Sequence, residues 1–239
     1  MNLVLSTAFV ALFCIDYYLM YSNTIKRNRN LTEKQRAHIL SIKASTTLFL
    51  ISVYINYKYI SSGFDVDGYT SGLSDGDNFL IKLGVFNLIA YLITDCYVGY
   101  QKYHKYMCTL SGYFHHITYT FISILAMYVD VPHLYLLFMI EELPTIFLSI
   151  GNYNKNIRQD YTFGFTFFIT RLLYHAWLTW HFSFNIFFGG LGFLAFCLHA
   201  YWFKNWFSKY VLKRNTQKPT QIPKTESKIQ MEKSKIQTK

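Results

Sequence analysis

Charged residues are scarce in this chain. They make up 15% of its 239 residues, whereas soluble globular domains carry about 25%. Hydrophobic residues make up 52%, and the charges are segregated, so several apolar runs approach the roughly 20 residues that a bilayer span requires. This composition excludes an ordinary soluble domain and predicts an all-α fold, a polytopic transmembrane helical bundle.

Cysteine is also rare. Cys14, Cys96, Cys108 and Cys197 show no paired spacing, and three of them lie in apolar segments. The sequence therefore indicates neither a disulfide framework nor a metal site. Cys108, in a basic loop, is either a palmitoylation site or a plain free thiol.

Two familiar membrane signatures are missing. Repeated histidine boxes of the HxxxH and HxxHH kind are absent, which argues against a di-iron desaturase or hydroxylase. The last apolar segment has no mid-helix lysine for a retinal Schiff base, since Lys204 lies at its end.

Positive charge gathers at the C-terminal end. The net charge is +10, but ten of the 23 basic residues lie from Lys204 onward. Such a tail favours a cytoplasmic location beside anionic lipid headgroups and argues against a nucleic-acid partner. We expect residues 211–239, rich in Lys, Gln, Thr and Ser, to be a disordered basic cytoplasmic tail.

The apolar runs predict about seven spans, the first of them retained because its positive charges follow the apolar run. The prediction is weakest for the second span, which contains Lys43 and Lys58, and for the fifth, which is short, so six spans remain an alternative. The two lysines lie near span ends, where their long side chains can reach the interface. The expected spans are residues 3–21, 39–60, 79–100, 112–128, 133–150, 161–182 and 186–207.

The loops between these spans alternate in charge. Loops 22–38, 101–111 and 151–160 contain lysine or arginine, whereas loop 61–78 has none and holds four aspartates. The positive-inside rule then places the N-terminus outside or in a lumen and the C-terminus in the cytoplasm. We expect the endoplasmic reticulum or another internal membrane.

Polar residues occur where lipid is expected, and nearly all of them fall in the cytoplasmic half. An uncompensated charge at the bilayer centre costs about 2.5–3.5 kcal/mol, so these groups should face one another or line a wet cavity. Pro144 should also free the carbonyl of Ile140. We therefore expect one polar chamber, built from the third to seventh spans and open to the cytoplasmic side. The residues are Asp16, Asp95, His115, His116, Glu141, Glu142, Arg171, His175 and His199.

Several of these residues have a structural alternative. A pair between Arg171 and a glutamate could equally hold helices together, and Asp16 and His199 are typical of polar residues that pack helices. His133 and His181 lie near the outer interface. For His115 and His116 we favour function: adjacent positions point about 100° apart on a helix, so one imidazole can face a substrate while a carboxylate such as Asp95 holds the other.

Several segments together resemble the TLC-domain family, which includes ceramide synthases, translocating-chain-associated membrane proteins and small uncharacterised membrane proteins. The resemblance spans about residues 39–210. It divides the chain into 1–38 (first helix and basic loop), a TLC-like transmembrane domain at 39–210, and the tail at 211–239. The segments that carry the resemblance are the stretch around Asp95, GYFHHITYTFISI (112–124), EELPTIFLSIG (141–151), FFITRLLYH (167–175) and LHAYWFKNW (198–206).

The ceramide-synthase branch implies transfer of an acyl group from acyl-CoA, as co-substrate, to a sphingoid-base amine, with no further cofactor. His115 and His116 would then be catalytic, and Asp95, Glu141 and Arg171 would complete the site. Glu141–Glu142–Leu143–Pro144 replaces the aspartate-rich element of ceramide synthases, however, so the chain is more similar to the small uncharacterised branch. Two hypotheses stay open: an acyltransferase-like enzyme, and a non-enzymatic protein that binds or senses lipid and regulates membrane lipid composition.

Overall fold

The computed structural model describes residues 3–107 and 109–213, without the side chains of 109–111, 186 and 187. Within these ranges the chain forms helices and no strand, which confirms the all-α fold. Cys108 and residues 214–239 of the expected tail lie outside the described residues. Contacts group Met1–Phe203 into one compact unit; the second unit begins at Lys204, and its described part continues the last helix to Tyr210.

Every segment expected to span the membrane is helical, although three of them are built from shorter pieces. The fourth combines a π-helical segment with α6, and the sixth joins α9 and α10 through another. The helices are α1 (Leu3–Arg27), α2 (Glu33–Arg36), α3 (Ile39–Ser61), α4 (Val66–Ser71), α5 (Asp75–Lys102), α6 (His115–Tyr128), α7 (Pro132–Leu137), α8 (Glu142–Tyr153), α9 (Asp160–Phe167), α10 (His175–His181) and α11 (Ile186–Tyr210). The π-helical segments are η2 (Thr109–Phe114) and η5 (Phe168–Tyr174), and the 3₁₀ segments are η1 (His104–Tyr106), η3 (Phe138–Glu141) and η4 (Lys155–Ile157).

Four helical stretches of the described chain are long and apolar enough to cross a membrane: Leu3–Arg27, Glu33–Ser61, Asp75–Lys102 and Pro132–Tyr153. They include the two spans that the sequence marks as weakest. Lys43 pairs with Asp16 of α1, and Lys58 lies 3.0 Å from Asp77 of α5, so each lysine of α3 is compensated by an aspartate of a neighbouring helix. The pairing also gives Asp16 the helix-packing role expected for it.

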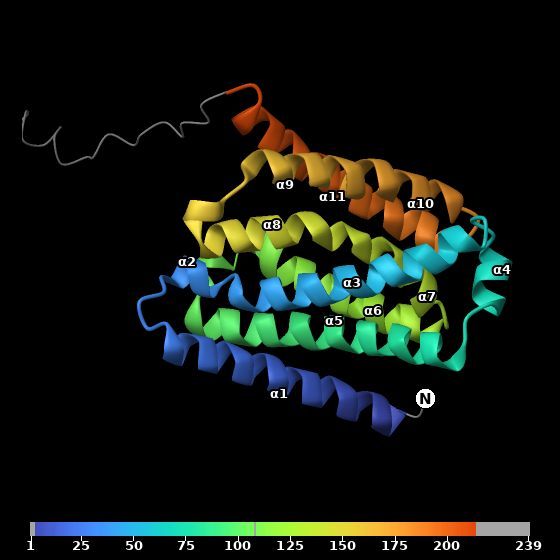
Figure 1. Cartoon of the computed structure of the whole chain (residues 1–239), viewed down its shortest axis with the longest axis horizontal. Coiled ribbons are helices and arrows are strands. Elements are labelled where there is room, and N and C mark those ends of the chain that lie inside the picture. Colours follow the sequence, from blue (N-terminus) through green and yellow to red (C-terminus); the bar gives the residue numbers. More distant parts are fainter. Residues whose placement is uncertain (1–2, 108, 214–239) are drawn as a thin grey trace, which may run out of the picture. The chain divides into compact units, whose positions relative to one another are not determined.

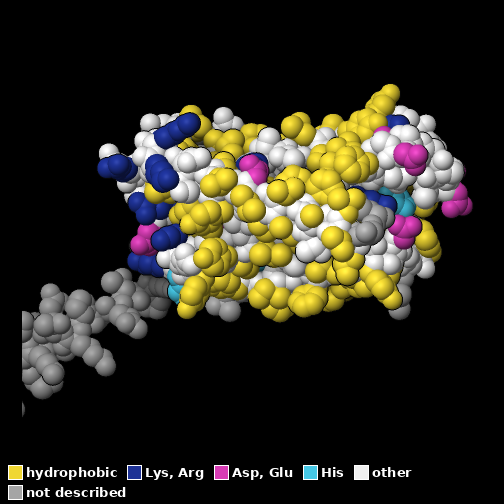
Figure 2. Space-filling view, turned by 90° about the horizontal axis from the view of Figure 1, so that it is seen from below, with side chains coloured by type: hydrophobic (Ala, Val, Ile, Leu, Met, Phe, Trp, Pro, Cys, Tyr) yellow, Lys and Arg dark blue, Asp and Glu magenta, His cyan; other side chains and the backbone are white. Residues whose placement is uncertain are grey.

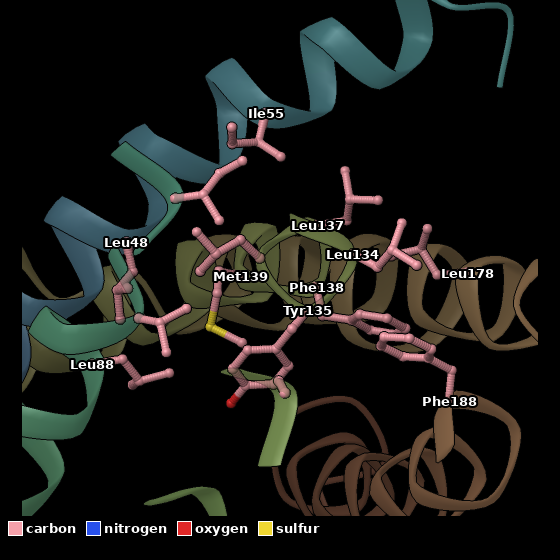
Figure 3. Close-up of a cluster of buried hydrophobic side chains, with 14 of the residues drawn as sticks. Leu48, Ile55, Leu88, Leu134, Tyr135, Leu137, Phe138, Met139, Leu178 and Phe188 are labelled. Atoms are coloured by element: carbon pink, nitrogen blue, oxygen red, sulfur yellow. The ribbon is translucent and has the colours of Figure 1, made fainter. Parts of the chain in front are cut away.

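The long helices pack as neighbours in an order that differs from their order in sequence. α1 lies on α5, α5 lies between α1 and the pair α3 and α6, and α3 continues the layer to α8 and α9 (Figure 1). A buried apolar cluster joins α3, α5, α7, η3 and α10, with Leu48, Leu88, Leu137 and Leu178 among its members (Figure 3). Because lipid tails are as apolar as leucine, close packing rather than transfer out of water holds such a cluster together.

Side chains on the outside match a lipid environment. Large apolar residues such as Leu12, Phe121 and Trp180 are exposed, and hydrophobic side chains cover much of the face in Figure 2. An apolar surface this extensive would be a liability in water.

The connections between helices separate by charge. Those after α1, α5 and α8, which carry the lysines and arginines named by the loop pattern, lie at one end of the bundle (Figure 1). Gln35 of α2 donates to the carbonyl of Tyr153, 2.8 Å away, and so joins two of them. The connections after α3, α6 and α10 lie at the other end. We call these the basic end and the acidic end.

Candidate functional site

A cavity of about 460 Å³ lies inside the first unit, within the size range of ligand pockets. Ala37, His38, Tyr106 and Met107 line its part at the basic end, and Leu48, Leu88 and Phe138 line its apolar interior. Side chains of α3 form one wall, so the expectation of a chamber built from the third to seventh spans alone is wrong. Its polar lining consists of His38, Ser41, Asp95, His115, His116, Glu141, Glu142, Thr145, Arg171 and His199.

All five residues expected to be catalytic, His115, His116, Asp95, Glu141 and Arg171, line this one cavity. They come from four separate segments: α5, α6, η3 and η5. The structure therefore brings the expected site residues together. Asp95 and Glu141, at 4% and 7% exposure, are turned away from any surrounding lipid.

His116 is held by a carboxylate. Its Nδ1 lies 2.8 Å from the carbonyl of Gly112, and because a carbonyl only accepts, Nδ1 carries the proton. Its Nε2 lies 3.0 Å from Oδ2 of Asp95, close enough for an ion pair although the ring is not aligned for a hydrogen bond. Backbone and carboxylate thus fix this imidazole from both sides.

Asp95 is fixed in turn by Tyr103, which directly follows α5. The Tyr103 hydroxyl donates to Oδ1 of Asp95 over 2.5 Å. Burial, and then the Asp95 charge, raise the pKa of the Tyr103 phenol far above its ordinary value, so the phenol stays protonated and keeps donating. Tyr103, Asp95 and His116 form a chain that ends at the cavity.

We expect Tyr103→Phe to lower the free energy of unfolding by about 1–3 kcal/mol, because Asp95 then loses the Tyr103 hydroxyl as a donor while staying buried. Unfolding of the purified protein in detergent micelles measures the change. Tyr97→Phe, at a position 55% exposed on the same helix as Asp95, is the matched control and should change little. Equal stability of the two variants would show that the Tyr103–Asp95 bond contributes nothing.

His115 is placed differently from its neighbour. Its ring packs on Tyr119, with ring centroids 4.3 Å apart, and on Trp202 at 5.9 Å. Among the described residues its buried Nδ1 has no hydrogen-bond partner. His115 lines the cavity, and its ring is held by aromatic packing, whereas a carboxylate holds His116.

Arg171 binds the segment that carries the glutamates. Its Nε donates to the carbonyl of Glu141 over 2.9 Å, and its Nη2 donates to Thr145 over 2.7 Å. Oε1 of Glu142 is 3.5 Å from Nη2, while Oε2 of Glu142 accepts from Ser45 at 2.6 Å. Arg171 therefore neutralises charge and ties η5 to η3 and α8.

Pro144 lies in the first turn of α8, directly after the 3₁₀ segment η3. Because proline has no amide hydrogen, position 144 donates no backbone hydrogen bond to the turn before it. Arg171 donates to the carbonyl of Glu141 in that turn. That Pro144 frees the carbonyl of Ile140 stays a prediction.

Glu141 also meets two histidines that the sequence places outside the catalytic set. Nδ1 of His175 is 2.7 Å from Oε1 of Glu141, and Nδ1 of His199 is 3.5 Å from Oε2. The spacing of Arg171 and His175 on one helix face was a usable signal. Nothing in the sequence shows that α11 turns His199 toward the same carboxylate.

The helices that carry the site are irregular. The π-helical segment η2 directly precedes His115, and η5 contains Arg171. Such segments are rare and often mark functional sites. Comparisons of the chain with protein-family models, with curated proteins and with solved structures find no match. The site's geometry is therefore the basis of the functional inference.

Other singled-out residues lie away from the cavity. Nε2 of His133 is 3.3 Å from the Thr70 hydroxyl, and His181 stacks on Trp177, both near the acidic end. Gly192 permits close approach of α11, because a Cβ there would lie 2.6 Å from the Thr179 hydroxyl. A Cβ at Gly190 would have nothing within 4 Å.

Proposed function

We propose that this chain is a multi-pass membrane protein of the TLC-domain type that transfers an acyl group from acyl-CoA to a lipid acceptor in its cavity. The observation that carries this proposal is the arrangement of the histidine pair. His115 lines the cavity, and His116 beside it is fixed by Asp95. A cavity-lining imidazole next to a positioned one is suited to general-base catalysis.

In this reaction His115 accepts the proton of the acceptor's amine or hydroxyl group. The acceptor atom forms a bond to the thioester carbonyl carbon, the carbon–sulfur bond breaks, and CoA leaves as the thiol with that proton. The ion pair of His116 with Asp95 places positive charge near the carbonyl oxygen as it becomes negative. No further cofactor is required.

The position of the cavity agrees with this use. Its lining reaches the basic end, where lysines and arginines attract the phosphates of CoA. Its apolar interior, with Leu48, Leu88 and Phe138, suits an acyl chain. A second cavity of about 60 Å³ shares Phe138, Met139 and Glu141 with the first in its lining and is also mostly apolar.

The proposal includes seven spans, with the basic end in the cytoplasm and the N-terminus outside or in the lumen of an internal membrane such as the endoplasmic reticulum. All basic connections lie at one end of the bundle, as this orientation requires. Beyond the four long apolar stretches, the seventh span would be the continuous helix α11. The fourth and sixth would cross as interrupted helices, which membranes tolerate where neighbouring helices satisfy the backbone.

A non-enzymatic lipid-binding protein is the second candidate. Arg171 lines the cavity and meets Glu142 only at 3.5 Å, so an anionic headgroup could take the place of that carboxylate. Lipid would then be held without turnover.

Purified protein in lipid nanodiscs, given long-chain acyl-CoA with sphingoid bases or lysolipids, separates the two candidates. We expect an acylated product detected by mass spectrometry and free CoA in equal amount. Co-purified lipid without any product would instead support the binding protein. The absence of both an acylated product and bound lipid would contradict both candidates.

A further inference from the structure

Glu141, His175 and His199 form a buried cluster at the inner side of the cavity. Each offers one ligand atom, and these atoms lie within 4.8 Å of one another. They come from η3, α10 and α11, and their exposures are 7%, 3% and 2%. Three such donors from separate elements rarely meet in a membrane bundle without a function.

The hydrogen bonds of His175 show which nitrogen is available. Its Nε2 lies 2.8 Å from the carbonyl of Gly192, and because that carbonyl only accepts, Nε2 carries the hydrogen. In a neutral ring, Nδ1 then directs a lone pair at Oε1 of Glu141, 2.7 Å away. Two acceptors at this distance repel each other unless a cation, a proton or a metal ion, lies between them.

The position of His199 favours a metal ion over a proton at this place. Its Nδ1 is 3.5 Å from Oε2 of Glu141 and has no hydrogen-bond partner within the described part of the chain. A proton shared by His175 and Glu141 would leave this buried nitrogen unsatisfied, which is costly. A metal ion would be bound by all three side chains.

We propose that Glu141, His175 and His199 bind a divalent transition-metal ion of the Zn²⁺ type. Two imidazoles and one carboxylate form a donor set that zinc uses when a fourth position stays open. Glu141 and His199 line the cavity, so that position faces it. The sequence alone indicates no such site, and the proposal does not rest on acyl transfer.

The groups around the cluster fit a metal centre. A metal-bound histidine normally donates its second ring N–H to a backbone carbonyl or carboxylate, as His175 does to Gly192. Arg171 donates its Nε to the backbone oxygen of Glu141, so that bond leaves the Glu141 carboxylate free for the ion. The ion would fix α10 and α11 against η3.

The test uses the full chain purified in detergent, stripped with a chelator and titrated with Zn²⁺ alone. We expect one equivalent to bind and to raise the unfolding temperature. His175→Gln and His199→Gln should each weaken binding at least about 100-fold, because loss of even an outer hydrogen bond weakens metal sites by about 10- to 100-fold. His181→Gln, on the same helix as His175, is the control and should bind like wild type.

Titrations with Fe²⁺ and Mn²⁺ and elemental analysis of the protein as purified identify the ion, since iron also uses two histidines and one carboxylate. A monodisperse wild type that binds none of the three ions overturns the proposal. So does a site that keeps its affinity in both glutamine variants, because the ion then lies elsewhere. Metal binding is measured without acyl-CoA or a lipid acceptor, so failure of the metal proposal can be told apart from failure of the proposed acyl transfer.

Discussion

His115→Ala is expected to lower the rate of acyl transfer by about 10²- to 10⁴-fold, the usual contribution of a general base. The reason is its place in the lining of the cavity, where the imidazole would take the acceptor's proton. The ring packs on Tyr119 and Trp202 without hydrogen bonds to them, and its removal should therefore affect rate more than folding.

His116→Ala and Asp95→Asn provide the comparison. These residues act through their 3.0 Å contact, and groups that act as one unit show non-additive losses. The double variant should consequently be about as slow as the slower single variant. His181→Ala, near the acidic end, should keep wild-type turnover. Full turnover by His115→Ala, with His181→Ala as reference, would remove the histidine pair from the mechanism.

Arg171→Leu is expected to lower the free energy of unfolding by about 3–5 kcal/mol, as happens when one partner of a buried ion pair is removed. The guanidinium is bonded to the Glu141 carbonyl and to Thr145, and its contact with Glu142 is 3.5 Å long. Without it, Glu142 retains the Ser45 hydroxyl but loses its opposite charge, and the Glu141 carbonyl loses the hydrogen bond from Nε.

Unfolding of the protein in mixed detergent micelles measures this loss. Arg29→Leu, at an exposed site in the loop after α1, should change stability by less than about 0.5 kcal/mol. Arg171→Lys should fall between wild type and Arg171→Leu, because lysine keeps the charge but not the planar set of donors. If Arg171→Leu is as stable as Arg29→Leu, Arg171 does not hold these helices together.

The helices could be predicted from sequence because each apolar run is close to a bilayer in length. The expected segments at 39–60 and 79–100 match α3 and α5 to within a few residues. The breaks inside helices could not be predicted so easily. Pro144 signals one of them, but η5 contains neither proline nor glycine, and its π-helical form depends on contacts with other helices.

The site was predictable in its members and only partly in its contacts. Burial cost alone implies that Asp95, Glu141 and Arg171 face inward, and they line one cavity. Which charges meet is a matter of helix packing: Asp95 meets His116, whereas Glu141 meets His175 and His199. Helical periodicity shows which residues share a face, but not which face of α11 meets η3. Tyr103 lies outside every expected span, and the sequence does not predict its contact with Asp95.

The most direct test of lipid transfer in this cavity is a lipidomic comparison of membranes that contain wild type or the His115→Ala/His116→Ala variant at equal abundance. A His133→Ala/His181→Ala variant, altered near the acidic end, is the control. We predict that one acylated lipid class accumulates with wild type and the control and falls to background with the His115→Ala/His116→Ala variant. Identical lipid profiles for all three proteins would contradict a catalytic role for the pair.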